Sequence, residues 1–368
     1  MRKNSINFGS ARASFIGLDL ADKQSTFVGI DGRGRLVEEG KVTTDAGGLQ
    51  REFADRQRCR IALEVGTHSP WVDRLLREMG HEVITANPRE VALIYRNKRK
   101  SDKLDATTLA RLARSDPELL HPVKHRGKQA QIDLAVLRAR DGLVAARTQL
   151  VNLVRGAVKS YGERLPKCST ESFPAKAAAA LPADLSPALT PVIEQIAALS
   201  ERVRQYDQEI ERLITERYPE ALGLQQVKGV GPITSLAYVL TLEYPGRFPT
   251  NRDVGAYLGL TPGRRQTGES DPEMHITKAG DVFLRKLVVQ AAQYILGPFG
   301  VDCDLRRWGL RLAGTPANAD GQPRKGSKQR KKRAIVAVAR KLAVLLLALW
   351  RTGEVYDPLR WASRKEAA

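Results

Sequence analysis

The chain has 368 residues, of which 60 are lysine or arginine and 41 are aspartate or glutamate, so its formal charge is +19. This excess indicates a polyanionic partner, either nucleic acid or an anionic membrane surface. The longest apolar run, 342–350, is about half of the roughly 18 residues that span a bilayer, and no apolar segment follows the basic N-terminus, so we expect no membrane helix and no signal peptide. Three well-separated cysteines without a CxxC pair argue against a disulfide framework, a zinc site and a secreted protein.

Strands dominate the first part of the chain, after an expected flexible tail over 1–14. Three strands follow the tail, over 15–20, 25–31 and 35–42. Helices and strands then alternate: helix 46–56, strand 60–65, helix 70–79, strand 81–86 and a helix that Pro88 opens. Three consecutive strands followed by alternating helices and strands predict a mixed α/β sheet with flanking helices, over residues 15–128.

A long helical segment is predicted for 129–218, with a Pro/Ala-rich linker over 166–191. Apolar residues recur at heptad spacing on both sides of this linker. The predicted seam of the first helix consists of Val136, Ala139, Leu143, Ala146, Leu150, Leu153 and Ala157. That of the second helix consists of Ile196, Leu199, Val203, Tyr206, Ile210 and Leu213. The two helices can form an intramolecular hairpin or a coiled coil between copies of the chain, and both can hold at once.

The rest of the chain is predicted to be mainly helical, with a compact domain over 219–310 and a basic loop and final helix over 311–368. The segment Val227-Lys-Gly-Val-Gly-Pro232 is typical of a helix-hairpin-helix-like turn. Gly229 and Gly231 would let backbone N–H groups point at one phosphate. A plain tight turn uses the same residues.

Positive charge concentrates in the C-terminal part, where seven of the ten residues from 324 to 333 are basic and none is acidic. Such a run is either a solvated loop or a contact with phosphates. The charge of the whole chain favours the contact, because each neutralised phosphate releases condensed counterions. The expected contact residues are Arg324, Lys325, Lys328, Arg330, Lys331, Lys332 and Arg333.

Four carboxylates lie where an ionised side chain needs a partner. Asp19 and Glu64 are inside apolar strand segments, where charge is costly unless it is paired or metal-bound. Asp102 and Asp105 are three residues apart at the start of a helix and project from one face. Each alone is more often structural, but together in a basic chain they predict a Mg²⁺ site with open positions for a phosphate. Nearby cations that would attract a nucleic-acid backbone are Lys98, Arg99 and Lys100.

A polar loop over 261–270 combines hydroxyl and guanidinium groups. Arg264 and Arg265 carry planar guanidinium groups that suit phosphate oxygens, and Thr267 and Ser270 carry hydroxyls. A hydroxyl can attack phosphorus if it is deprotonated and the phosphate charge is compensated. By composition alone, an ordinary polar loop is the more frequent interpretation.

These segments, in this order, resemble the DEDD transposases of insertion sequences (the one-ten family), which are bridge-RNA-guided recombinases. The resemblance covers roughly residues 15–310 and, more loosely, the basic helical end. The segments that carry it are Ile16-Gly-Leu-Asp19, Leu63-Glu64-Val-Gly-Thr67, His81-Glu-Val to Asn87-Pro88, Lys100-Ser-Asp102-Lys-Leu-Asp105-Ala106, Val227-Lys-Gly-Val-Gly-Pro232, Ala256-Tyr-Leu-Gly-Leu-Thr-Pro262, Gln266-Thr-Gly268, Ile276-Thr-Lys-Ala-Gly280 and Leu284-Arg-Lys-Leu287. The resemblance implies an RNase H-like (RuvC-like) N-terminal domain, a coiled-coil linker and a C-terminal transposase domain.

The resemblance also implies a role for individual residues. The family's four acidic metal ligands carry over onto Asp19, Glu64, Asp102 and Asp105. The family nucleophile is a serine directly before the glycine of the polar loop, and this chain has Thr267 there, whose β-methyl group restricts χ1 and crowds in-line attack. Ser270 is the fallback nucleophile, and Lys278 is a further expected nucleic-acid contact.

The function that the resemblance implies is Mg²⁺-dependent strand cleavage and exchange of DNA through a covalent hydroxyl-phosphodiester intermediate. Its partners would be donor and target DNA, a structured noncoding guide RNA that selects sequences by base pairing, and further copies of the chain in a dimer of dimers. The expected location is the bacterial cytoplasm, in association with the nucleoid. Two alternatives stay open: a hydrolytic RuvC-like Mg²⁺-dependent nuclease, and a non-catalytic nucleic-acid-binding scaffold.

Overall fold

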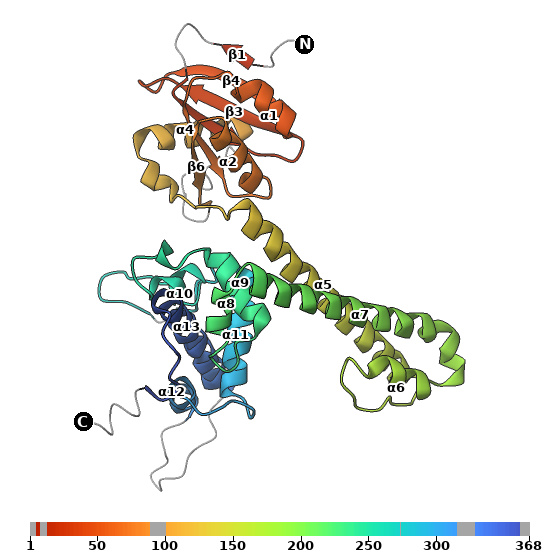
Figure 1. The fold of residues 1–368 in the computed structure, drawn as a ribbon. Coiled ribbons are helices and arrows are strands. Elements are labelled where there is room, and N and C mark those ends of the chain that lie inside the picture. The colour runs from red at the N-terminus through yellow and green to blue at the C-terminus, as the bar shows by residue number, and fades with distance from the viewer. Residues whose placement is uncertain (1–4, 8–12, 89–100, 273, 315–327, 361–368) are drawn as a thin grey trace, which may run out of the picture. The chain divides into compact units, whose positions relative to one another are not determined.

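The computed structural model describes residues 5–7, 13–88, 101–272, 274–314 and 328–360. The predicted helix after Pro88 and the predicted contacts Lys98, Arg99, Lys100, Arg324 and Lys325 lie outside these residues. The chain divides into two compact units, Met1–Arg126 and Gly127–Ala368 (Figure 1). Within the described ranges, no helix has both the length and the apolar composition that a membrane crossing requires.

The described part of the N-terminal unit is built on one mixed sheet of six strands. In spatial order these are β1 (Ser5–Asn7), β4 (Leu36–Thr43), β3 (Gln24–Ile30), β2 (Phe15–Asp19), β5 (Arg60–Glu64) and β6 (Glu82–Ala86). The first four pair in antiparallel fashion, whereas β2, β5 and β6 run parallel. This confirms the mixed sheet that the sequence predicts.

The structure differs from the expected N-terminal tail at residues 5–7, which form strand β1. This strand pairs with β4, with Ile6 opposite Glu39. Without it, the outer edge of β4 would present unpaired N–H and C=O groups to solvent. A strand of three residues is too short for an alternating pattern to be recognised in the sequence. Its extended conformation depends on pairing with the edge of β4.

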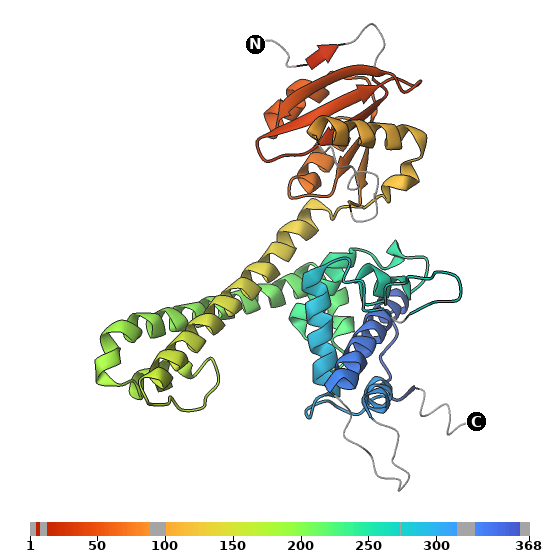
Figure 2. The same cartoon turned by 180° about the vertical axis from the view of Figure 1, so that it is seen from behind.

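Helices cover both faces of the sheet. One face packs on α1 (Ala46–Phe53) and α2 (Ser69–Glu78), and the other packs on α4 (Asp102–Ser115), which Figure 2 shows crossing the sheet. Side chains of a strand alternate between its faces. Leu18 of β2 therefore belongs to the core with α1 and α2, whereas Ala62 of β5 belongs to the core with α4.

The described part of the C-terminal unit is helical, as the sequence predicts. Its helices are α5 (Lys128–Ser160), α6 (Phe173–Ala179), α7 (Ser186–Glu216), α8 (Glu220–Leu224), α9 (Pro232–Leu242), α10 (Asp253–Tyr257), α11 (Val282–Leu296), α12 (Asp304–Ala313) and α13 (Lys328–Thr352). One large apolar core joins α9, α11, α13 and the near ends of α5 and α7. At its centre Tyr238 is fully buried, and its hydroxyl donates to the carbonyl oxygen of Ala343 at 2.6 Å.

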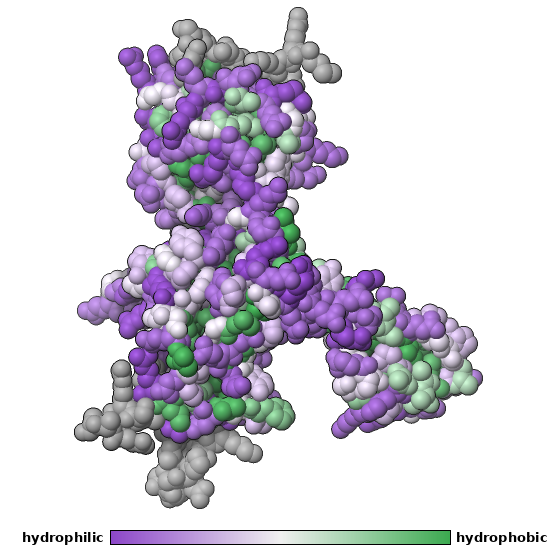
Figure 3. Space-filling model, viewed as in Figure 1, coloured by the Kyte–Doolittle hydropathy of each residue, from purple (hydrophilic) through white to green (hydrophobic). Residues whose placement is uncertain are grey.

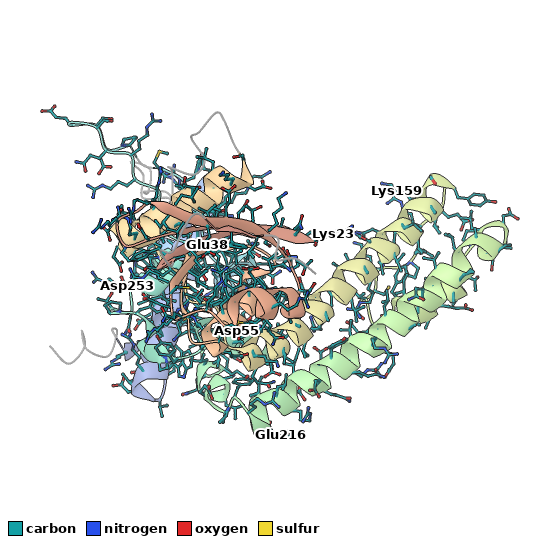
Figure 4. The ribbon with its side chains drawn as sticks, turned by 90° about the horizontal axis from the view of Figure 1, so that it is seen from above. Lys23, Glu38, Asp55, Lys159, Glu216 and Asp253 are labelled. Carbon is teal, nitrogen blue, oxygen red and sulfur yellow. The ribbon has the colours of Figure 1, made fainter. Side chains whose placement is uncertain are left out.

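Helices α5 and α7 pack side by side as an antiparallel hairpin within one chain. Figure 4 shows the pair, with Lys159 at the far end of α5 and Glu216 at the near end of α7. The stretch predicted as a linker, 166–191, holds α6 and the start of α7. Phe173 of α6 is buried there in a small core with Val158 of α5. A coiled coil between copies of the chain stays a prediction.

The buried stripe of α7 coincides with its predicted seam, but that of α5 is displaced by one residue. Leu137, Val154 and Val158 are buried, whereas the predicted seam residue Leu153 is 53% exposed. Two arginines lie on the true stripe: Arg140 donates to Asp207 at 2.7 Å and Arg147 to Ser200 at 3.2 Å. Arginine is usually a surface residue, so the heptad positions that include these two arginines are less apolar in sequence than the positions one residue earlier. The sequence therefore predicts the wrong stripe for α5.

Candidate active site

Two carboxylates end neighbouring parallel strands at the same edge of the sheet. Leu18 of β2 lies opposite Leu63 of β5, so the residues that follow them, Asp19 and Glu64, are at corresponding positions. Both are half-buried. Because Ala62 faces α4 and Glu64 is two residues further along β5, the strand alternation puts both carboxylates on the α4 face.

Helix α4 carries the other two carboxylates in its first turn. The Ser101 hydroxyl accepts a hydrogen bond from the Leu104 N–H at 3.3 Å and so caps the helix. Asp102 is exposed and Asp105 is buried. Negative charge in the first turn is favourable, because the helix dipole is positive there.

The direction of α4 brings this first turn to the edge where β2 and β5 end. The Arg60 guanidinium, at the start of β5, donates to the carbonyl oxygen of Ala113 at 3.0 Å. The last turn of α4 therefore lies over the beginning of the parallel strands. Because the helix runs back across the sheet, Asp102 and Asp105 lie toward the strand ends that carry Asp19 and Glu64.

A glycine in β2 sets how closely α4 approaches the sheet. A Cβ atom at Gly17 would lie 1.8 Å from the carbonyl oxygen of Ala106 and 2.7 Å from the backbone nitrogen of Ala110. No other residue leaves room for that contact. Gly17 shares its strand face with Asp19, and Ala106 directly follows Asp105. The contact therefore fixes the distance between the backbones that carry these two carboxylates.

The four carboxylates share one end of one sheet face, and their chemistry suits a hard divalent cation, which prefers oxygen ligands. Within the described ranges, no group of three or more His, Cys, Asp or Glu side chains is arranged so that it could hold a metal ion. The backbone places the four residues at a common edge, whereas metal coordination by them stays a prediction.

Thr267 lies at the tip of a short β-ribbon in the C-terminal unit and is exposed. Thr267 and Ser270 exchange both backbone hydrogen bonds, each 3.0 Å long. Gly268, between them, has a φ of 56°, as the first central position of a type II′ turn requires. Residues paired in this way present their side chains on the same side, so both hydroxyls face one way.

Glycines close the base of this ribbon. A Cβ at Gly259 would lie 2.3 Å from the backbone of Ala279, and one at Gly280 would lie 1.8 Å from the carbonyl oxygen of Tyr257. The two glycine motifs of the sequence thus hold the ends of the ribbon together. Lys278 lies at this base and is exposed.

The two arginines of the ribbon are exposed as well. Arg264 forms an ion pair with Asp271 at 3.3 Å, with 71% of its side chain exposed. Such a pair contributes little to stability and leaves the guanidinium accessible to a phosphate. Arg265 precedes Thr267 by two residues, so the tip presents positive charge next to a hydroxyl.

The glycine turn between α8 and α9 has a packing explanation. Gly229 has a φ of 101°, and a Cβ there would lie 3.1 Å from the Ile295 side chain. Gly231 has no atom within 4 Å of such a Cβ. The close packing accounts for Gly229 without a ligand, and only Gly231 has open space. The other described candidates for phosphate contact, at the start of α13, are exposed: Lys328, Arg330, Lys331, Lys332 and Arg333.

Two residues that position the carboxylates were not singled out in the sequence, although each leaves a signal there. Gly17 is a glycine inside an apolar strand, which indicates a close approach of another backbone. Ser101 directly precedes an acidic first turn, which is typical of a helix N-cap.

The sheet order, the helices on both faces and the carboxylates at the ends of the central parallel strands are consistent with an RNase H-like domain of the DEDD type. Comparison with known families agrees. Residues 16–163 match a DEDD domain model of IS110 elements described as "Transposase", and residues 222–298 match the model "Transposase IS116/IS110/IS902 family".

Curated relatives extend over nearly the whole chain. A protein of Pseudomonas aeruginosa named "Probable family 20 transposase" is 30% identical, over 94% of this chain and 99% of its own length. The "Transposase for insertion sequence element IS1111A" of Coxiella burnetii is 25% identical, over 93% of this chain and 90% of its own length. The chain belongs to the IS110/IS116/IS902 family of transposases and is an enzyme of DNA recombination.

Proposed function

We propose that this transposase cleaves and rejoins DNA through a covalent bond between Thr267 and a DNA phosphate, with Mg²⁺ and under the guidance of an RNA. The observation that carries the proposal is the edge of the sheet shared by Asp19, Glu64 and the first turn of α4. The exposed hydroxyl at the ribbon tip supports the covalent step.

Each part of the site has a task in this proposal. Asp19, Glu64, Asp102 and Asp105 would hold Mg²⁺, which when bound neutralises charge that develops on the phosphate oxygens. Arg264 and Arg265 bind and orient the phosphate through their planar guanidinium groups. In this proposal the turn around Gly268 presents the Thr267 hydroxyl for the attack.

The covalent step exchanges one ester bond for another. Thr267 Oγ1 forms a bond to phosphorus while the bond from phosphorus to the leaving deoxyribose oxygen breaks. The threonine hydroxyl loses one proton and the leaving oxygen takes up one. Because the phosphodiester bond energy is kept in the adduct, a deoxyribose hydroxyl of another strand can reverse the step and rejoin the DNA.

The remaining parts of the proposal concern partners. A structured guide RNA would select DNA by base pairing, which leaves the protein to bind backbones through cations. The carboxylates and Thr267 lie in different compact units of the chain. We propose a homo-oligomer, a dimer of dimers, in which different protomers supply the two halves of a site. We place the protein in the bacterial cytoplasm, with the nucleoid.

The test is a denaturing gel after the purified protein, with any RNA that copurifies, is incubated with Mg²⁺ and DNA that carries the element's ends. The proposal expects a protein–DNA adduct for the unaltered chain and none for Thr267→Ala or Asp19→Asn. Free DNA ends without an adduct would establish the hydrolytic nuclease instead. If neither Asp19→Asn nor metal removal changes cleavage, both the covalent mechanism and the hydrolytic nuclease are contradicted. Tight binding of DNA without any cleavage would indicate a non-catalytic scaffold.

A further inference from the structure

The C-terminal unit contains a groove of about 1640 Å³ between α12, α13 and the base of the ribbon that carries Thr267. Its floor is apolar and includes Leu305 and Trp308 of α12 and Val344 and Leu345 of α13. Pockets for small ligands have volumes of roughly 300–1,000 Å³. The groove is larger than these, so its size suits a segment of a chain molecule.

Cations line the rim of this groove. Arg252, Lys278, Lys332 and Arg340 line it, and none of these four pairs with a carboxylate of the described residues. Two carboxylates, Asp304 and Asp357, also line it, fewer than the cations. An apolar floor below a cationic rim fits a ligand with flat apolar groups on an anionic backbone.

One side of α13 runs along the groove and changes in character along its length. Arg333, Lys341, Val344 and Ala348 line the groove, so the stripe passes from cationic to apolar. From residue 333 to residue 348 a helix rises about 22 Å, the length of several nucleotides. On the face seen in Figure 3, the C-terminal unit has hydrophobic patches among hydrophilic residues.

A lysine lies against the aromatic ring in the floor. Lys341 Nζ is 3.9 Å from the centroid of the Trp308 ring. Burial, aided by the nearby charge of Arg311, lowers the pKa of Lys341. A phosphate beside this ammonium would stabilise its charged form, and the part of the indole that lines the groove could contact a base.

We propose that this groove holds an unpaired segment of the DNA strand next to the cleavage point, with its bases against the floor and its phosphates along the rim. The inference rests on the proposed function, because Pro262 and Ile276 of the Thr267 ribbon line one end of the groove. Bases inside a duplex are stacked and cannot reach an apolar floor, which selects a single strand. We assign the strand as DNA because the ribbon whose base lines the groove carries, at its tip, the hydroxyl proposed to react with DNA.

The experiment measures binding of a fluorescent twelve-nucleotide oligothymidylate to the full chain by anisotropy. Two variants alter the groove: Val344→Glu places a charge in its floor, and Lys332→Gln removes a rim cation. Lys159→Gln, at the far end of the hairpin, removes the same charge outside the groove. Each variant is first checked for an unchanged melting temperature.

The proposal expects Val344→Glu to weaken oligothymidylate binding roughly tenfold, as loss of about one stacked base would. Lys332→Gln should weaken it several-fold and lower its salt dependence, whereas Lys159→Gln should do neither. A strand of equal length with abasic sites should bind the unaltered chain roughly tenfold less tightly. If the abasic strand binds equally well, or Val344→Glu has no effect, the floor holds no bases and the proposal is overturned.

A second measurement uses the unaltered chain and so does not depend on the folding of a variant. Ultraviolet crosslinking of an oligonucleotide that contains 5-iododeoxyuridine should attach it to Trp308, which peptide mass spectrometry can locate. Crosslinks confined to other regions, or tenfold tighter binding of oligouridylate, would overturn the assignment to single-stranded DNA. Thr267→Ala should bind the oligonucleotide normally, so a failed covalent mechanism and a failed groove assignment give different results.

Discussion

The carbonyl oxygen of Ala106 lies so close to Gly17 that a Cβ on the glycine would be 1.8 Å from it. Two carboxylates depend on this contact, since Asp19 is two residues beyond the glycine and Asp105 is directly before the alanine. The backbones of β2 and α4 therefore approach each other at the edge where the candidate metal ligands lie. The positions of the candidate metal ligands therefore depend on how closely α4 packs on the sheet at Gly17.

Gly17→Ala should abolish DNA cleavage, because α4 must move away from β2 to make room for the methyl group. The change should also lower the free energy of unfolding by roughly 1–3 kcal/mol, as overpacking does. Cleavage on a denaturing gel and the midpoint of chemical unfolding measure the two effects. Gly32→Ala is the matched control, because a Cβ there meets nothing within 4 Å. Full activity of Gly17→Ala would show that α4 does not position the site.

Apart from β1, the strands and α-helices described in the N-terminal unit could be predicted because alternation, glycine turns and helix caps are local signals. The phase of α5 could not, because Arg140 and Arg147 occupy its buried stripe and are satisfied only by Asp207 and Ser200 on another helix. A heptad count treats arginine as an exposed residue, and it cannot show that a residue on another helix accepts the hydrogen bonds of a buried guanidinium.

In the candidate site, too, some features could be predicted from local sequence and others depend on the fold. The four acidic residues were visible as charges in apolar or capping contexts. A shared metal site was predicted from them, but the sheet edge at which the four backbones lie was not, since it follows from the direction of α4, which the contact of Arg60 with Ala113 reveals. The groove along α13 combines the segments around Leu260, Trp308 and Val344, which are far apart in the sequence, so only the fold discloses it.

Asp133 should be a major anchor of the helical hairpin. Its carboxylate is 4% exposed and accepts hydrogen bonds from the Tyr218 hydroxyl at 2.7 Å and the Arg217 guanidinium at 2.9 Å. Asp133→Asn should lower the free energy of unfolding by roughly 1–3 kcal/mol, because an amide weakens both bonds. Arg204→Gln, which breaks the exposed pair with Glu201, should change it by less than about 1 kcal/mol. Equal effects of the two variants in urea unfolding would contradict this.

The contribution of Asp133 should depend on pH in a defined direction. Burial raises the pKa of its carboxyl, but hydrogen bonds from Tyr218, Arg217 and Gln129 outweigh burial, so the pKa is below its usual value. A lowered native pKa contributes stability that is complete above the unfolded value of about 3.9 and is lost as the pH falls through the native value. The difference in unfolding free energy between the unaltered chain and Asp133→Asn should be constant from about pH 5 to 8 and shrink below about pH 4. A difference that stays constant into strong acid would assign the stabilisation to packing alone.

Thr267→Ser should accelerate formation of the protein–DNA adduct, because it keeps the hydroxyl and removes the methyl group that restricts χ1. Relief of an unfavourable rotamer of about 1 kcal/mol corresponds to a rate increase of roughly fivefold. The adduct band is measured over time with saturating Mg²⁺ and DNA, beside Thr267→Ala, which should form none. Ser270→Ala distinguishes the two hydroxyls, since their residues are paired across the same turn and face the same side. If Ser270→Ala loses the adduct and Thr267→Ala retains it, the nucleophile is Ser270, and the same ribbon serves the reaction through its other hydroxyl.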